Sequence, residues 1–371
     1  MLEMVVTPSG LRAWRVERYA DVRRVLSETD TFSSRPGHLA HVVSWMDPES
    51  PVVEGDFSRM DGPAHRRLRG VLGAEMTAAR RTKEFAERLD VIAEAEAERL
   101  SRQDGPVDLV TAYCRPLALT ALVHLLALPE DRVPLLTEAA ESVLNLNNDA
   151  DRVAAGIAPM LAYVFQLVQE RRQAPQEDIL SRMLTRSEAS GEPLTDGELT
   201  AVAGALFANG YATTAGSVAQ CVLALLTRPA ARDAFVAGLP AVAPATVAEL
   251  LRHQGQGVQL LRSATRGTVI AGTAVEKGDY LLADVGSASF DPARYPDPYA
   301  FDLERNPADH LTFGHGAHRC PAERFALLEI EVGLRALFTR FPTLRLAVPA
   351  DELAENAAHV APGPRGLPVG W

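Results

Sequence analysis

The chain has 371 residues, of which 47% are hydrophobic and 23% are charged, so it has enough apolar material for a sizeable core. Its net charge of −11 argues against nucleic acid or an anionic membrane surface as a partner. Three cysteines are too few, and odd in number, for a disulfide framework, which indicates a reducing compartment. Because neither a signal peptide nor a membrane span is recognisable, we expect a cytoplasmic protein without membrane contact.

Residues 11–34 have the pattern of a short strand followed by a helix with one apolar face. Residues 35–58 then show little periodicity, and long connections of this kind are often functional. An ordinary surface loop is the alternative, but Trp45 and Val52 favour a partly buried environment. We find no linker, internal repeat or low-complexity tract that would divide the chain into domains.

A basic helix face is expected next, at residues 61–69. Asp61 suits the N-cap of a helix whose first turn contains Pro63. His65 and Arg69 are four residues apart and therefore share a face. Such a pair suits carboxylates, which arginine binds through charge-assisted, bidentate hydrogen bonds. Taken alone, a basic helix face is more often merely solvated.

Residues 80–195 are mostly amphipathic helix and are expected to form scaffold. The clearest helical patterns cover residues 84–102, 116–127 and 152–173. The Asn- and Asp-rich residues 142–151 predict a turn between two helices. Which of these asparagines would meet a ligand stays open at this point.

Residues 198–227 form a long helix that is apolar on nearly all sides, so it is expected to be buried. Gly210 in its middle costs about 1 kcal/mol relative to alanine, which indicates a close approach or a kink. Polar residues also interrupt this middle part: Asn209, Tyr211, Thr213 and Thr214. A threonine inside a helix can simply bond back to a carbonyl one turn earlier.

Two further patterns follow along the chain. Glu249 and Arg252 lie three residues apart in the helical stretch 244–252 and face the same way; as an exposed pair they would contribute little. Residues 258–283 then switch to short alternating runs punctuated by glycines, which predicts a small sheet with tight turns.

The stretch from His310 to Val332 combines a glycine-rich loop, Cys320 and a long apolar-periodic helix. Unpaired backbone N–H groups at a helix start favour a thiolate, so we expect a lowered pKa for this cysteine. Gly314 and Gly316 let the backbone pass close to a flat object. A thiolate in this setting suits a metal held in a planar macrocycle, such as haem. A buried structural cysteine is the alternative.

Four motifs, taken in chain order, resemble those of the cytochrome P450 family, the haem-thiolate monooxygenases. The resemblance covers residues 11–371 and implies a mainly α fold with a minor β region. It also implies one large domain, residues 1–371, with haem between a distal helix and the cysteine-loop helix. The motifs are His65-x-x-x-Arg69, Gly210-x-x-Thr213-Thr214, Glu249-x-x-Arg252 and Phe313-Gly314-x-Gly316-x-His318-x-Cys320.

The resemblance assigns roles to individual residues. Cys320 would bind the iron of haem b, and Thr213 would lie beside bound dioxygen. Glu249 and Arg252 would be tied to a later arginine in a folding role, for which Arg305 is our candidate. Residues 35–58 would form the loop over the substrate pocket. The haem propionates would be bound by His65, Arg69, Arg262 and His318.

An oxidoreductase of the monooxygenase type is therefore expected, acting on a small organic molecule in natural-product biosynthesis. Electrons would come from a separate ferredoxin-type donor, because no flavin or iron–sulfur segment is recognisable. Arg319 and Arg324 would receive this acidic partner, or are merely solvated.

The chain departs from the family pattern at the distal helix. Ala212 stands where an acid is usual and Asn209 where an alanine is usual. Since a carboxylate is a good proton relay, we expect atypical proton delivery. Alternatives are an enzyme that uses peroxide or nitric oxide and needs no ferredoxin, or a haem-binding protein without turnover. Ala322 in the cysteine loop and Ser289-Phe290-Asp291 are smaller departures.

Overall fold

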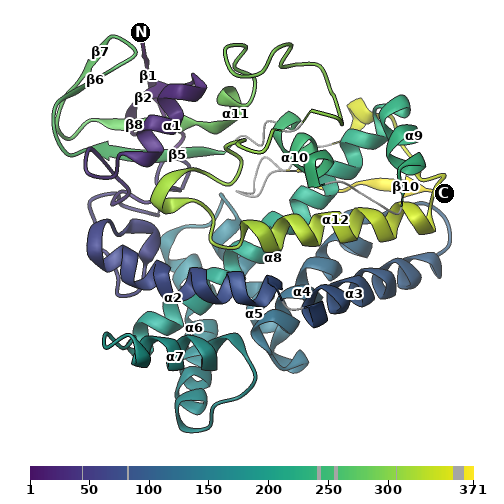
Figure 1. Cartoon of the computed structure of the whole chain (residues 1–371), viewed down its shortest axis with the longest axis horizontal. Coiled ribbons are helices and arrows are strands. Elements are labelled where there is room, and N and C mark those ends of the chain that lie inside the picture. Colours follow the sequence, from purple (N-terminus) through teal and green to yellow (C-terminus); the bar gives the residue numbers. More distant parts are fainter. Residues whose placement is uncertain (44, 82, 240–243, 255–257, 306, 354–362) are drawn as a thin grey trace.

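The computed structural model of the chain describes residues 1–371 apart from 44, 82, 240–243, 255–257, 306 and 354–362 (Figure 1). Helices dominate it, and the strands gather in small sheets, so the expected mainly α fold with a minor β region is confirmed. The helices are α1 (Tyr19–Ser27), α2 (Gly62–Arg81), α3 (Lys83–Ser101), α4 (Arg115–Leu126), α5 (Val133–Leu144), α6 (Ala150–Gln173), α7 (Ile179–Ala189), α8 (Asp196–Leu226), α9 (Pro229–Ala237), α10 (Pro244–His253), α11 (Val285–Ala288) and α12 (Glu323–Arg340).

The largest described sheet has the strand order β1-β2-β8-β5-β3 and lies at the N-terminal end of the molecule (Figure 1). Within this sheet, β2 pairs with β8 in parallel, whereas all the other strand pairs are antiparallel. Smaller sheets join β4, β10 and β9, and β6 with β7. The strands are β1 (Glu3–Val6), β2 (Arg12–Val16), β3 (Phe32–Ser33), β4 (Val107–Asp108), β5 (Gln259–Ala264), β6 (Thr268–Ile270), β7 (Thr273–Val275), β8 (Tyr280–Asp284), β9 (Arg345–Leu346) and β10 (Pro368–Gly370).

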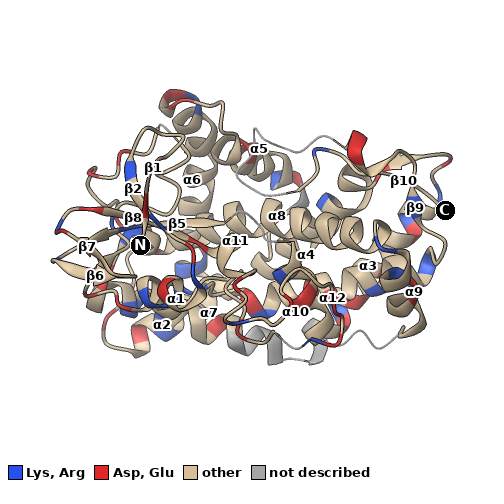
Figure 2. Ribbon diagram, turned by 90° about the horizontal axis from the view of Figure 1, so that it is seen from above, with Lys and Arg blue, Asp and Glu red and all other residues tan. Residues whose placement is uncertain are grey.

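Helix α8 runs through the centre of the helical region and contacts α4, α5, α6 and α12 (Figure 1). Its start is fixed by a capping box: Thr195 Oγ1 accepts a hydrogen bond from the Glu198 N–H at 3.0 Å, and the Glu198 carboxylate accepts one from the Thr195 N–H at 3.0 Å. From there the apolar sequence extends the helix over 31 residues, and most of its side chains are buried. Charged residues of both signs are scattered over the surrounding elements (Figure 2).

The long connection before α2 is ordered by a buried arginine and lies against α8. Arg59 donates hydrogen bonds to the carbonyl of Arg35 at 2.7 Å and to the hydroxyl of Ser50 at 2.9 Å. A Cβ atom at Gly55 would come within 2.6 Å of the Cβ atom of Ala201. The connection therefore packs directly on the first turns of α8.

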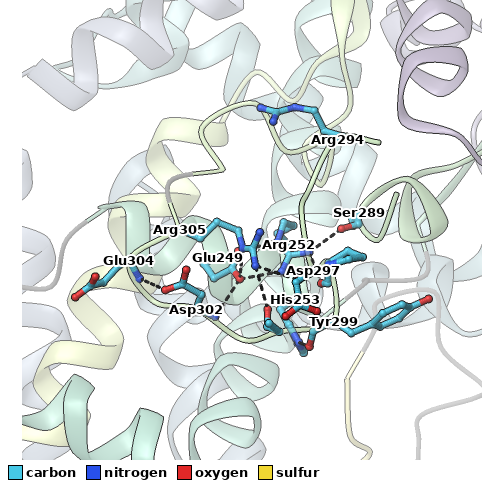
Figure 3. A network of polar contacts seen from close by, with 12 residues as sticks. Glu249, Arg252, His253, Ser289, Arg294, Asp297, Tyr299, Asp302, Glu304 and Arg305 are labelled. Atoms are coloured by element: carbon cyan, nitrogen blue, oxygen red, sulfur yellow. Dashed lines mark hydrogen bonds and ion pairs between the residues drawn. The ribbon is translucent and has the colours of Figure 1, made fainter. Parts of the chain in front are cut away.

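A buried ion network locks α10 to the segment that leads to the cysteine loop (Figure 3). Arg252, which is 0% exposed, donates to both carboxylate oxygens of Glu249 at 2.7 and 2.8 Å. It also donates to the carbonyl of Ser289 at 2.7 Å. Arg305 is the third member, with its Nε 3.2 Å from Glu249 Oε1. The assignment of Arg305 from sequence is thus confirmed. Ser289, the first residue of the triplet that departs from the family pattern, contacts Arg252 through its carbonyl.

Among the described residues, α6 is the one helix long and apolar enough to pass a simple test for a membrane span. Only 28% of the tested window is buried. Helices of water-soluble proteins can have the same length and apolar composition.

Candidate functional site

The cysteine loop folds tightly against the first helix of the chain. Gly314 and Gly316 have φ angles of +73° and +72°, and a Cβ atom at Gly316 would lie 2.8 Å from the carbonyl oxygen of Leu26. Both positions therefore require glycine. The Cys320 N–H donates to the carbonyl of Phe313 at 2.8 Å, which closes the loop. Cys320 is partly exposed, whereas Cys114 and Cys221 are buried, so Cys320 is the best placed of the three cysteines to meet a ligand.

The protonation of Cys320 differs from the expectation. Burial raises the pKa of the Cys320 thiol, while the Ala322 N–H and the Arg69 guanidinium act in the lowering direction. The predicted net lowering is wrong, because desolvation of a thiolate outweighs the few donors near the start of α12. Coordination of a cation by the sulfur reverses the balance, since a coordinating thiol loses its proton.

The rings of two histidines from distant segments lie in contact just before Cys320. The rings of His65, on α2, and His318 are 4.1 Å apart between centroids, with 31° between their planes. His318 Nε2 lies 3.1 Å from Asp61 Oδ1. The Asp61 carboxylate also accepts hydrogen bonds from Ser33 Oγ at 2.6 Å and the Ser34 N–H at 3.0 Å. Asp61 directly precedes the first residue of α2, at the predicted N-cap position, and its side chain also joins α2 to the cysteine loop.

Arg262 and Arg69 complete the cationic set that the sequence predicted. Arg262 is buried on β5 and donates to the carbonyl of Leu261 at 2.8 Å. Arg69 donates to the carbonyl of Arg319 in the cysteine loop. Together with His65 and His318 these arginines form what we call the cationic cluster: His65, Arg69, Arg262 and His318.

The cationic cluster has hydrogen-bond donors left over. Within the described part of the chain, His65 Nε2 and Arg262 Nε are buried without a hydrogen-bond partner. Burial and the neighbouring charges of His318 and Arg69 lower the pKa of His65 to about 4. Burial lowers the pKa of Arg262 to about 10, against the opposing effect of Asp61. Buried cations and unpaired donors are costly unless an anion accompanies them, so the cluster fits a carboxylate-bearing group such as the propionates of haem.

One side of α8 remains open in its middle. Asn209 and Thr213, one turn apart, are exposed, whereas Tyr211, Ala212 and Thr214 are buried. We call Asn209 and Thr213 the open strip. The Thr213 hydroxyl donates to the carbonyl of Asn209, as expected for a threonine inside a helix. The same geometry leaves the oxygen of this hydroxyl facing outward as an acceptor.

The surroundings of the open strip are close-packed. A Cβ atom at Gly210 would come within 2.9 Å of the Leu122 side chain on α4, so this glycine allows a close approach, one of the two predicted reasons for it. A Cβ atom at Gly363 would lie 3.4 Å from the carbonyl of Gly216. The C-terminal segment therefore returns against α8 about one turn beyond Thr213. The residues just before Gly363, 354–362, lie outside the described residues.

Sequence reasoning missed His38. Burial and the charge of Arg262 lower the pKa of this imidazole to about 4, with a smaller contribution from His318. His38 therefore lies near the cationic cluster. It comes from the non-periodic connection before α2, where a sequence pattern carries no positional information.

Comparisons with known proteins agree with this architecture. The family model described as Cytochrome P450 matches residues 240–359. Nocardicin C N-oxygenase of Nocardia uniformis subsp. tsuyamanensis is 32% identical, with 98% of this chain and 91% of the relative covered. Mycinamicin IV hydroxylase/epoxidase of Micromonospora griseorubida is also 32% identical, with the same coverage. The crystal structure of CYP105P1 in complex with filipin I has a TM-score of 0.92 at 31% identity and covers 100% of this chain and 92% of that one.

Fold and relatives together define a haem-dependent oxidoreductase of the monooxygenase class. The chain belongs to the cytochrome P450 family. It is accordingly an enzyme that acts on a small molecule with dioxygen and electrons from a redox partner.

Replacement of Arg262 by leucine is expected to weaken haem retention at least about tenfold, because a charge-assisted hydrogen bond contributes roughly 1.5–3 kcal/mol. The measurement is the rate at which haem passes from the purified protein to an excess of apomyoglobin. Arg12→Leu, at an exposed arginine on strand β2 of the same sheet, is the control and should leave the rate unchanged. Equal rates for the two variants would contradict the assignment of Arg262 to a propionate.

Proposed function

We propose that the protein is a cytoplasmic haem b monooxygenase of natural-product biosynthesis, folded as one domain of residues 1–371, with Cys320 as the iron ligand. The observation that carries this is the partly exposed residue Cys320 on a closed glycine loop, beside a cationic cluster with spare donors. The names of the relatives support the biological setting, since one is an N-oxygenase of nocardicin C and another a hydroxylase/epoxidase of mycinamicin IV.

The bound haem would supply the activation of dioxygen, for which a thiolate ligand is suited. Cys320 holds the iron, and the cationic cluster of His65, Arg69, Arg262 and His318 binds the propionates. Thr213 would lie beside the dioxygen, and its hydroxyl donates to the carbonyl of Asn209. The connection of residues 35–58 packs on α8 and shields the pocket from water.

A ferredoxin-type protein is proposed as the electron donor, docking beside the cysteine loop. Of the two arginines considered for this role, Arg319 forms an ion pair with Glu323 at 2.5 Å. The carbonyl of Arg319 also accepts a hydrogen bond from Arg69. Arg324 is exposed and forms no ion pair within the described part of the chain, so it is the better candidate for an acidic partner.

Proton supply is the feature in which this enzyme would differ from its family. Ala212 is buried and has no ionisable group. A proton needed at the open strip then has to come from Thr213, from water or from the substrate itself. A reaction that draws on the substrate's own groups, such as coupling or desaturation, fits this arrangement better than plain hydroxylation.

Replacement of Ala212 by glutamate is expected to raise the fraction of electrons that end in product, because it supplies a carboxylate relay one residue before Thr213. Ala212→Gln is the matched control, since it adds a side chain of the same shape that cannot donate a proton as an acid. Product formed per NADPH consumed is the measurement. If the glutamate and glutamine variants form as much product per NADPH as the wild type does, proton supply at this position does not limit the reaction.

The missing acid also favours a second candidate, an enzyme driven by peroxide or nitric oxide without ferredoxin. Product formation with ferredoxin and NADPH, compared with peroxide alone or nitric oxide alone, separates the two. If no product forms with any of these reagents, a haem-binding protein without catalysis would be favoured.

A further inference from the structure

The open strip of α8 contains an asparagine with a specific orientation. Asn209 Nδ2 donates to the carbonyl of Ala205 at 2.8 Å. A carbonyl oxygen can only accept, so the NH₂ group of the amide faces the helix and the oxygen Oδ1 faces away from it. Within the described residues, no donor contacts Oδ1. Asn209 therefore presents a free acceptor on the exposed side of α8.

Thr213 adds a second acceptor on the same side. Its hydroxyl proton is donated to the carbonyl of Asn209, so the lone pairs of Oγ1 are left for other partners. Ala212, which lies between the two in sequence, is buried and apolar. The open strip consequently offers two acceptors and no acid, and the second N–H of the Asn209 amide is its one remaining donor within the described residues.

A protein surface with these two acceptors discriminates between ligands. An acceptor that loses its water and gains no donor is unfavourable. A ligand with a hydroxyl or N–H group can satisfy Asn209 Oδ1, whereas an ether or a carbonyl places a further acceptor against it. An alanine at this position would make no such distinction.

We propose that Asn209 determines substrate specificity by accepting a hydrogen bond from a hydroxyl or N–H group of the substrate. This inference rests on the proposed function, because it takes the open strip to face the haem pocket. The substrate is then a molecule with a hydrogen-bond donor close to the position that is oxidised. The same donor is well placed to supply the proton that Ala212 cannot.

The test uses matched probes and the haem-loaded enzyme. The probes are two phenols and their methyl ethers: 2-naphthol with 2-methoxynaphthalene, and 4-phenylphenol with 4-methoxybiphenyl. Dissociation constants come from the change in haem absorption on titration. Wild-type enzyme is expected to bind each phenol about five- to tenfold more tightly than its ether, the effect of one hydrogen bond.

Two variants at position 209 and one control complete the design. Asn209→Ala should bring the phenol-to-ether ratio close to one by weakening only the phenols, and alanine is well tolerated in a helix. Asn209→Asp keeps an acceptor and should keep the preference. Tyr211→Phe removes a hydroxyl from a buried neighbour and should leave the ratio unchanged. A merely structural role of Asn209 would shift phenols and ethers alike.

Two results overturn the inference: a wild-type enzyme that does not favour the phenols, or an Asn209→Ala variant that favours them as strongly as the wild type does. Both are obtained on protein that shows a thiolate-ligated haem after reduction and addition of carbon monoxide. Protein that takes up no haem would overturn the proposed function itself, so the two failures are distinguishable.

Discussion

Replacing Cys320 with serine is expected to abolish both the thiolate signature of the reduced, carbon monoxide-bound haem and essentially all turnover. A serine hydroxyl does not ionise near neutral pH and is a poor replacement for a soft thiolate ligand. The loop itself should survive, because the bond from the residue 320 N–H to the carbonyl of Phe313 involves only backbone atoms. Difference spectra and product formation, measured on the same preparation, give both readouts.

Cys114→Ala is the matched control for this substitution. Cys114 is fully buried in the helical core, and burial raises the pKa of its thiol, so it is neither accessible nor prone to ionise. The variant should retain the thiolate signature. If instead Cys320→Ser retained both the signature and turnover, another residue would have to be the ligand.

Replacement of Glu249 by alanine is expected to destabilise the fold by about 3–5 kcal/mol, because it leaves a buried charge without its partner. Arg252 is 0% exposed and depends on Glu249 for both of its carboxylate hydrogen bonds, and Arg305 also loses its ion pair (Figure 3). The free energy of unfolding, from denaturant titration of the purified protein, is the measurement. Failure to accumulate as folded protein would be the more severe form of the same effect.

An exposed ion pair provides the comparison. Arg102 and Glu98 lie on the surface at the end of α3, 3.6 Å apart, and such pairs contribute about 0–1 kcal/mol. Arg102→Ala should therefore change the unfolding free energy little. Similar losses for Glu249→Ala and Arg102→Ala would show that the buried network is not what holds α10 in place.

The sequence predicted those parts of the fold that depend on periodicity. Helix α8 followed from its apolar composition, and the sheet at residues 258–283 followed from alternation and glycines. The pairing of Arg305 with Glu249 was found through the family resemblance, and the structure confirms it. The roles proposed for Cys320 and Thr213 rest on motif matches and remain predictions.

What the sequence did not predict depends on three-dimensional neighbours. The pKa of Cys320 is set by burial more than by the helix start, and burial has no local sequence signal. The additional partners of Asp61, Ser33 and His318, were not predicted because they are far away in sequence. His38 lies in a segment without periodicity. The orientation of the Asn209 amide likewise depends on one carbonyl, that of Ala205.

The central claim, that the sulfur of Cys320 is bound to haem iron, is tested most directly by X-ray absorption at the iron edge of the haem-loaded wild-type enzyme. The account predicts four porphyrin nitrogens and one sulfur at about 2.3 Å, close to the length of a zinc–thiolate bond. An iron environment made only of nitrogen and oxygen would contradict it.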